Sequence, residues 1–151
     1  MAADSDFVLL FSPARERDVL AALLERVELP PRDDGHREED GLAVTLRVPA
    51  TPELDATLAR HPTAGAVRRE GEVLLGYVIL HRRLTEAPFG GRDHGLVLEL
   101  TLWPVTTNLW HVCSESDAVR ALLVDLLLRF EGIEGWVDHG DGTGHQFWPP
   151  P

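Results

Sequence analysis

The chain has 151 residues, 44% of them hydrophobic and 26% charged, and its 25 acidic and 14 basic residues give a formal net charge of −11. This length fits one globular domain, residues 1–151, with a substantial core. The acidity argues against binding to nucleic acid or to a membrane surface, because basic patches must meet the phosphates of both. It suits a basic protein partner, or simply keeps the chain soluble.

Residue usage indicates a cytoplasmic protein. All the basic residues are arginine, a usage typical of a GC-rich bacterial genome. A single cysteine, Cys113, excludes an internal disulfide and a multi-cysteine metal site. No apolar run approaches the ~18 residues of a membrane-spanning helix. The acidic start of the chain lacks the basic stretch of a signal peptide, so we expect a cytoplasmic location.

The first third of the chain predicts a strand, a helix and a loop. The continuous apolar run Phe7–Phe11 is typical of a strand that is buried on both faces. A serine–proline pair then provides a helix cap, so we expect a helix from Ser12 to about Glu28, where two prolines stop it. Residues 32–40 carry no aliphatic side chain, and we expect a mobile acidic loop over residues 30–40.

Two shorter elements follow. Apolar and polar residues alternate over Gly41–Val48, which predicts a half-buried strand. Thr51 and Pro52 repeat the pattern of a capped helix start, and this helix should end near Arg60, before a histidine–proline pair.

A glycine-rich connection predicts an antiparallel hairpin between the strands Glu72–Arg83 and Leu96–Trp103. In the second strand every other residue is leucine and faces the core, so Glu99 lies on the opposite face with Trp103. Regular alternation in the first strand would place four residues together on one face: Val73, Leu75, Tyr77 and Ile79.

The last third contains the clearest helical pattern, from Ser114 to Gly132. Ser114 and Asp117 have the spacing of a capping box, and Gly132 stands where a left-handed residue ends a helix. Ile133–His139 predicts an edge strand. Residues 138–151 predict a flexible tail rich in glycine and proline, because proline interrupts strand pairing.

The order of these elements is β-α-β-(α)-β-β-α-β. It predicts an α+β fold, a two-layer sandwich with a mostly antiparallel sheet of about five strands and two main helices on one face.

His111 and Cys113 are candidates for nucleophilic catalysis, because a histidine can activate a thiol near a helix start. On an extended segment, however, residues two apart point to opposite faces. A small buried cysteine at the junction of strand and helix is therefore the preferred interpretation, and the sequence predicts no cofactor.

His139 and His145, with Asp138, are candidates for a metal site, since two imidazoles and a carboxylate can bind a divalent transition ion. The glycines between the two histidines would hold such a site poorly. The alternative is a solvated turn in which glycine provides positive φ angles.

Aromatic residues concentrate in the last third of the chain, with tryptophans at positions 103, 110, 136 and 148. They can form a satellite core or a binding face, because tryptophan is common in both. The residues that we expect on a binding face are Trp103, Trp110, Tyr77, Glu99 and Arg47.

The leading hypothesis is therefore a non-enzymatic interaction module that uses the face of the sheet without helices, either to form a homodimer or to hold a protein partner. In size and charge the chain resembles bacterial immunity proteins that neutralise toxins, which implies an inhibitor-like role. The alternative is a small-ligand-binding protein or an enzyme with a pocket around His111, Cys113, His139 and His145.

Overall fold

The computed structural model describes residues 6–24, 27–28, 41–62, 67–85, 94–104, 107–139 and 143–149. Within these residues an eight-stranded sheet consists of β1 (Asp6–Phe11), β2 (Val27–Glu28), β3 (Gly41–Pro49), β4 (Val67–Arg69), β5 (Glu72–Thr85), β6 (Gly95–Trp103), β7 (Glu134–Asp138) and β8 (Gly144–Trp148). The helical segments are η1 (Pro13–Arg15), α1 (Glu16–Leu24), α2 (Pro52–Arg60), α3 (Thr107–Glu115) and α4 (Asp117–Arg129).

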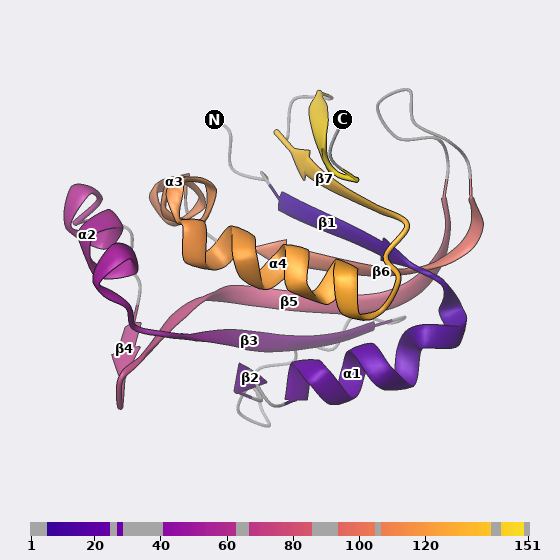
Figure 1. Ribbon diagram of the computed structural model, residues 1–151, viewed down its shortest axis with the longest axis horizontal. Helices are drawn as coiled ribbons and strands as arrows, with labels where there is room; N and C mark the ends of the chain where they lie inside the picture. The colour runs from indigo at the N-terminus through magenta and orange to yellow at the C-terminus, as the bar shows by residue number, and fades with distance from the viewer. Residues whose placement is uncertain are drawn as a thin grey trace.

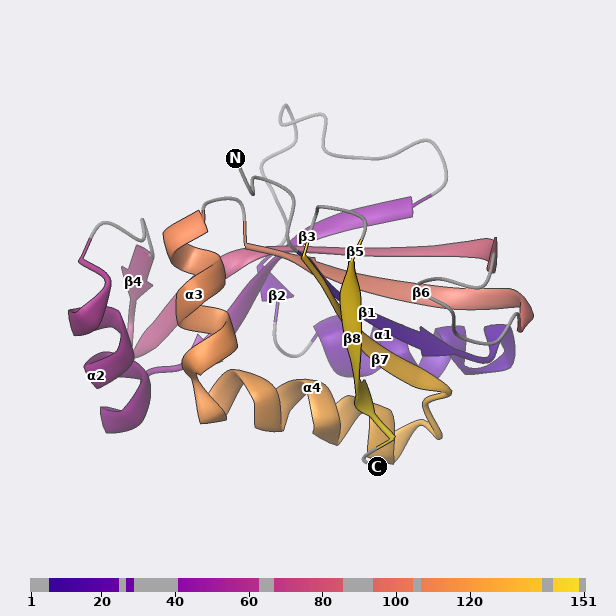
Figure 2. The same cartoon turned by 90° about the horizontal axis from the view of Figure 1, so that it is seen from above.

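The strands follow the order β2-β3-β5-β6-β1-β7-β8, with β4 also paired to β5, and neighbouring strands are antiparallel. The helices α1 and α4 pack against one face of this sheet, while α2 and α3 lie at one end of it (Figures 1 and 2). The predicted α+β fold is therefore confirmed. The predicted strands are β1, β3, β5, β6 and β7, and the predicted main helices are α1 and α4.

One apolar core fills the space between this face and the helices. The sheet contributes alternate residues of its central strands, and the helices contribute their inner faces; among the most buried are Leu9, Phe11, Leu98, Leu100, Leu102, Val19, Val119 and Leu127. Burying one such side chain stabilises the fold by about 1.5–3 kcal/mol. These residues account for the amphipathic patterns seen in the sequence.

A bulge in β5 overturns the predicted alternation of that strand. Val73 and Leu75 lie in the core, but so do Val78 and Leu80, so the pattern shifts by one residue between them. The pairing with β3 shifts at the same place, since Leu46 pairs with Gly76 and Arg47 with Leu74. Gly76 has a φ of 153°, and the bulge changes the face of the sheet on which each later residue of the strand lies.

The first helix begins as predicted but ends earlier. The Ser12 side chain accepts a hydrogen bond from the Ala14 backbone N–H at 3.3 Å, and Pro13 opens the short segment η1 that leads into α1. Helix α1 ends at Leu24, and Val27–Glu28 forms β2. The prediction of a helix to Glu28 was wrong, because these residues pair with β3.

The segment before α4 is a separate helix, α3, and not an extended junction. Ser114 lies inside α3, where its hydroxyl donates to the Trp110 carbonyl at 2.9 Å. The N-cap of α4 is Ser116, whose side chain accepts from the Val119 N–H at 3.3 Å. The predicted cap was therefore two residues too early.

The end of α4 also differs from the prediction. The left-handed residue is Glu131, with a φ of 53°, and the Gly132 N–H donates to the Leu127 carbonyl at 2.7 Å. This is a Schellman motif whose left-handed residue is Glu131 and not, as predicted, Gly132. Gly132 is required for space, because an added Cβ would lie 2.3 Å from the Leu127 side chain.

Strand β7 is not an edge strand. It pairs with β1 on one side and with β8 on the other. Residues 144–148, expected in a flexible tail, form β8, and Phe147 and Trp148 pack against the main core. The predicted acidic loop, 30–40, lies outside the described residues. None of the helices in the described ranges is long and apolar enough to span a membrane.

Candidate binding face

The sheet presents its second face away from the helices, and we call this the helix-free face. Along β1 it carries Asp6, Val8 and Leu10, which alternate with core residues. The register extends this pattern across the sheet. Leu10 pairs with Glu99 of β6 and with Glu134 of β7. The next row contains Val8 with Thr101 and Trp136, and Asp6 pairs with Asp138.

A pocket of about 240 Å³ lies on this face. Its walls come from four strands, β5, β6, β1 and β7, and the lining residues are Asp6, Val8, Leu10, Arg83, Glu99, Thr101, Trp136 and Asp138. Three carboxylates and one guanidinium give this lining a formal charge of −2. The pocket is therefore acidic, with an apolar and aromatic floor.

Glu99 is the most constrained polar group of the pocket. It is only 7% exposed and forms an ion pair with Arg83. The Thr101 hydroxyl donates to its carboxylate at 3.1 Å, and the His81 imidazole lies 3.7 Å away. A buried carboxylate needs such partners, because desolvation alone would cost several kcal/mol.

Glu134 has a similar arrangement on the other side of Leu10. It is 6% exposed, accepts a hydrogen bond from the Trp136 indole N–H at 3.2 Å, and lies 3.3 Å from the His94 imidazole. Each of these buried carboxylates thus faces a histidine, and the bond from Trp136 fixes the indole beside the pocket.

The helix-free face also has its own apolar residues. Leu10, Val97 and Trp136 are buried, yet they lie outside the main core. The aromatic residues of β8 pack on the helix side, so this strand does not cover the face. Two of these residues, Leu10 and Trp136, also line the pocket, and the predicted binding face remains a prediction.

The predicted binding residues lie at different places in the structure. Glu99 and Trp103 lie on the helix-free face as expected. Arg47 pairs with Glu72 at 3.4 Å near the far end of the sheet. The backbone of Tyr77 pairs with Trp103, while its side chain lies outside the described part of the chain.

Trp110 does not belong to the helix-free face. It lies in α3 and stacks on Phe7 of the core, with ring centroids 6.3 Å apart. His111 and His139 contact its edges at centroid distances of 5.1 and 6.0 Å. Trp110 therefore packs at the end of the core and cannot contribute to a site around Glu99.

The candidate nucleophile Cys113 is unsuited to catalysis. It is 2% exposed, and burial raises the pKa of its thiol from 9.0 to about 12. His111 is two residues earlier on the same helix, which places the side chains about 200° apart. His111 stacks instead on His61 of the α2 end, with centroids 5.8 Å apart.

His139 and His145 do come together, but without the carboxylate. The Nε2 atom of His139 lies 3.0 Å from Nδ1 of His145, so one imidazole donates to the other. Desolvation, helped by His139 and Arg120, lowers the pKa of His145 and favours the neutral form of that imidazole. Asp138 lines the pocket on the helix-free face, and the described residues contain no group of three potential metal ligands.

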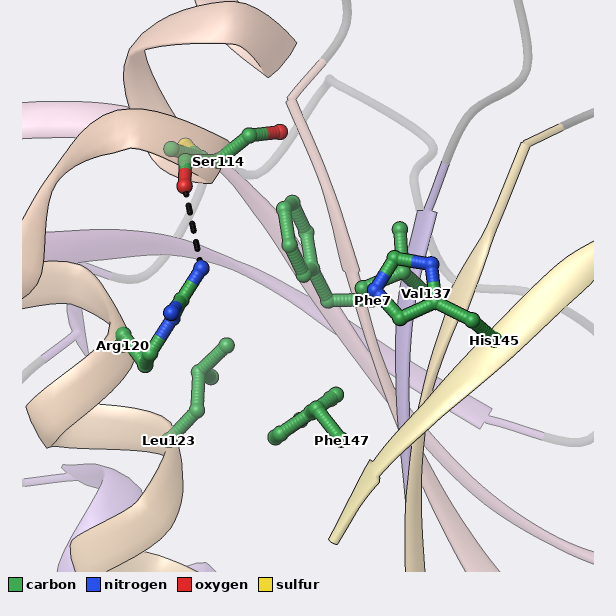
Figure 3. A pocket seen from close by; sticks show the side chains of 8 residues that line it. Phe7, Ser114, Arg120, Leu123, Val137, His145 and Phe147 are labelled. Atoms are coloured by element: carbon green, nitrogen blue, oxygen red, sulfur yellow. Dashed lines mark hydrogen bonds between the residues drawn. The ribbon is translucent and has the colours of Figure 1, made fainter. Parts of the chain in front are cut away.

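A second pocket of about 30 Å³ lies between α3, α4 and the β7–β8 pair (Figure 3). It is lined by Phe7, Cys113, Ser114, Arg120, Leu123, Val137, His145 and Phe147. The Arg120 side chain donates to the Ser114 carbonyl at its rim, at 3.4 Å. This volume has room for about one water molecule and not for a substrate.

No protein-family model, curated protein or solved structure matches this chain. The helix-free face is therefore the feature from which we infer a function. Sequence reasoning missed Asp6 and Trp136 as members of it. The period of two residues in a strand places Asp6 on the same face as Val8 and Leu10, but the pairing of β1 with β7 could not be read from local patterns.

Proposed function

We propose that this protein is a non-enzymatic interaction module that binds a basic partner protein through the helix-free face. The observation that carries the proposal is the acidic pocket of about 240 Å³ on a sheet face that the described helices leave open. Small-molecule sites usually occupy about 300–1,000 Å³, so the pocket fits part of a partner better than a whole ligand.

Charge supports a basic partner over a second copy of the chain. Each copy carries a net charge of −11, and a twofold interface would place two acidic pockets close together. A basic surface would be attracted by the same charges. An inhibitor-like role against a basic target is one form of this proposal.

A second candidate function is the binding of a small ligand near Cys113 and His145. The small pocket between these two residues favours this function. However, the pocket has a volume of only about 30 Å³, and the raised pKa of the Cys113 thiol weighs against a reaction there. We therefore prefer the interaction module.

The test compares two variants that each place a new positive charge on one face. Ile79→Arg alters the helix-free face beside Thr101, whereas Leu128→Arg alters the opposite side, on α4, where Leu128 is 62% exposed. Proteins retained from a bacterial lysate by the wild-type chain are purified, and the Kd of each is measured with both variants. Circular dichroism checks that both variants remain folded.

We expect Ile79→Arg to weaken the binding of a basic partner at least about tenfold, or 1.4 kcal/mol, because the new positive charge repels that partner. Leu128→Arg should leave the Kd unchanged. The opposite pattern would place the interface on the helices and contradict the proposal. A homodimer in light scattering whose dissociation constant changes in Ile79→Arg would favour self-association instead.

A further inference from the structure

We propose that the contact between His139 and His145 is a pH-sensitive switch: acid separates the two side chains and opens the space between β8 and the helices α3 and α4. His139 directly follows β7 and His145 lies in β8, and we call them the histidine pair. The pair lies on the helix side of the sheet, next to Trp110 of α3. The switch is therefore independent of the proposed function, which uses the helix-free face.

The histidine pair is joined by a hydrogen bond that a fully protonated pair cannot form. The Nε2 atom of His139 lies 3.0 Å from Nδ1 of His145, and one of these two nitrogens must accept. When both imidazoles are positively charged, every ring nitrogen carries a proton and no acceptor remains, while two like charges face each other. The bond therefore survives the first proton that the pair takes up and is lost with the second.

The surroundings of His145 also oppose its positive charge. The side chain lines the pocket of about 30 Å³ together with apolar side chains from β1, β7, β8 and α4, and among the described residues of this lining none is acidic. Arg120 of α4 lies across the pocket from His145 (Figure 3). Desolvation, followed by the positive charges of His139 and Arg120, lowers the pKa of His145 below 6.5. The closed pocket thus favours the neutral imidazole.

Helix α3 adds no negative charge beside the histidine pair. Its His111 contacts the same Trp110 ring as His139, at centroid distances of 5.1 and 6.0 Å from the indole. Its Cys113 thiol stays neutral, because burial raises the pKa to about 12. A charge on His111 in acid would therefore add to the repulsion at this end of the core.

The acidic residues of the neighbouring elements lie elsewhere. Those of the strands β1 and β7 are on the helix-free face: Asp6, Glu134 and Asp138. Glu115 of α3 pairs with His61 at 2.7 Å, and Asp125 of α4 forms an ion pair along its own helix. Asp117 is exposed at the start of α4. The described charges that act on His145 are positive.

Protons therefore favour the separated state of the histidine pair. An imidazole that leaves the pair enters water, where its pKa is about 6.5. The separated state binds a proton more tightly than the paired state, so separation is favoured as the pH falls below about 6.5 and the pair is favoured above that value. β8 is the last strand in the sheet order and pairs with β7. Separation lets β8 move away from the helices, which exposes the pocket beside Cys113.

The test uses Cys113 as the reporter, because it lines this pocket and is buried when the pocket is closed. The rate at which dithiodipyridine modifies the folded chain is divided by the rate for the urea-unfolded chain at the same pH, which gives a rate ratio. About pH 5.5 and about pH 7.5 both lie below the thiol pKa of either state, so the thiolate fractions contribute equally to the ratio at both. We expect the ratio to be at least about threefold higher at the lower pH.

Two variants assign the effect to the histidine pair. His145→Gln removes the titrating imidazole, so its rate ratio should be the same at both pH values. His81→Gln is the matched control. His81 lies 3.7 Å from the Glu99 carboxylate, which favours its positive charge, so this variant should keep the pH dependence of the wild type.

Two further variants test the positive charge of Arg120. Arg120→Gln should raise the pKa of His145 toward 6.5 and make the pH dependence of the rate ratio smaller, because it removes a like charge. Arg129→Gln removes a positive charge from an exposed position on the same helix, beside Asp125, and should change neither quantity. Proton NMR of the His145 imidazole measures its pKa in each variant.

The switch is contradicted if the rate ratio of the wild type is the same at both pH values, or if His145→Gln keeps the pH dependence. Loss of the pH dependence in His81→Gln would also contradict it, since another histidine would then be responsible. Circular dichroism is recorded at both pH values. A wild-type chain that loses its helical signal at about pH 5.5 would show global unfolding in place of a local opening, and this result too would overturn the proposal.

Discussion

At the scale of single residues, Gly76 has the strongest steric requirement. Its φ is 153°, a conformation that residues with a side chain rarely adopt, and an added Cβ would lie 2.3 Å from the Trp103 carbonyl oxygen. Gly71 is a natural comparison, because its φ is 79° but no atom lies within 4 Å of the added Cβ.

We expect Gly76→Ala to lower the free energy of unfolding by about 3 kcal/mol, and Gly71→Ala by about 1 kcal/mol. Both variants lose stability because alanine disfavours a positive φ. The difference between the two losses therefore measures the additional cost of the close contact between position 76 and the end of β6. Urea unfolding of the two variants gives both values. Equal losses would show that the contact with Trp103 is relieved by a small shift of the backbone.

A second prediction at this scale concerns Cys113. A rise in its pKa from 9.0 to about 12 lowers the thiolate fraction at pH 7 about 1,000-fold, a factor of ten for each pH unit. We expect a disulfide reagent to modify the folded chain very slowly and the urea-unfolded chain rapidly. Rapid modification of the folded chain would restore the enzyme hypothesis.

At the scale of elements, Glu53 of α2 holds the start of α4. Its carboxylate accepts from the Asp117 N–H at 3.0 Å, from the Ser116 hydroxyl at 3.1 Å and from the Ala118 N–H at 3.4 Å. Desolvation raises the pKa of Glu53, but these bonds and one from Thr57 together lower it below 4.5. A carboxylate at a helix N-terminus is also favoured by the helix dipole.

This arrangement predicts a pH dependence. Because the folded pKa of Glu53 is lower than the unfolded pKa, its contribution to stability is present above about pH 4.5 and is lost as the pH falls through the folded pKa. We expect Glu53→Gln to cost about 1 kcal/mol at pH 7 and progressively less at lower pH, as the wild-type carboxyl becomes protonated.

Urea unfolding over a series of pH values from 7 downward measures the effect. Asp125→Asn serves as the control, because its carboxylate is exposed and pairs only with Arg129 among the ion pairs of the described residues. A cost for Glu53→Gln that does not change with pH would show that shape, and not charge, holds α4.

At the scale of the whole molecule, the net charge of −11 should govern how fast a basic partner associates. Raising the ionic strength shortens the Debye length from about 30 Å at 0.01 M to about 8 Å at 0.15 M. We expect the association rate to fall about tenfold over this range, with a much smaller change in the dissociation rate. Stopped-flow mixing measures both rates, and a constant association rate would contradict electrostatic steering.

Local patterns predicted the elements well and their limits less well. The alternating leucines of β6 and the helical stripe of α4 correspond to the core they indicated. The errors fell where a tertiary contact overrode the local signal. Val27 pairs with β3 and is not part of the helix in which it was predicted. Ser116, whose hydroxyl donates to Glu53, caps α4 in place of Ser114.

The sequence by itself determined the fold class, the main helices and strands, and the face on which Glu99 and Trp103 lie, because these depend on the spacing of apolar residues within one element. The tertiary structure alone decided that β1 lies between β6 and β7. That order sets Asp6 opposite Asp138 and Glu99 near Trp136, and so creates the acidic pocket. Strand order depends on contacts between distant segments, on which the pattern within a single strand carries no information.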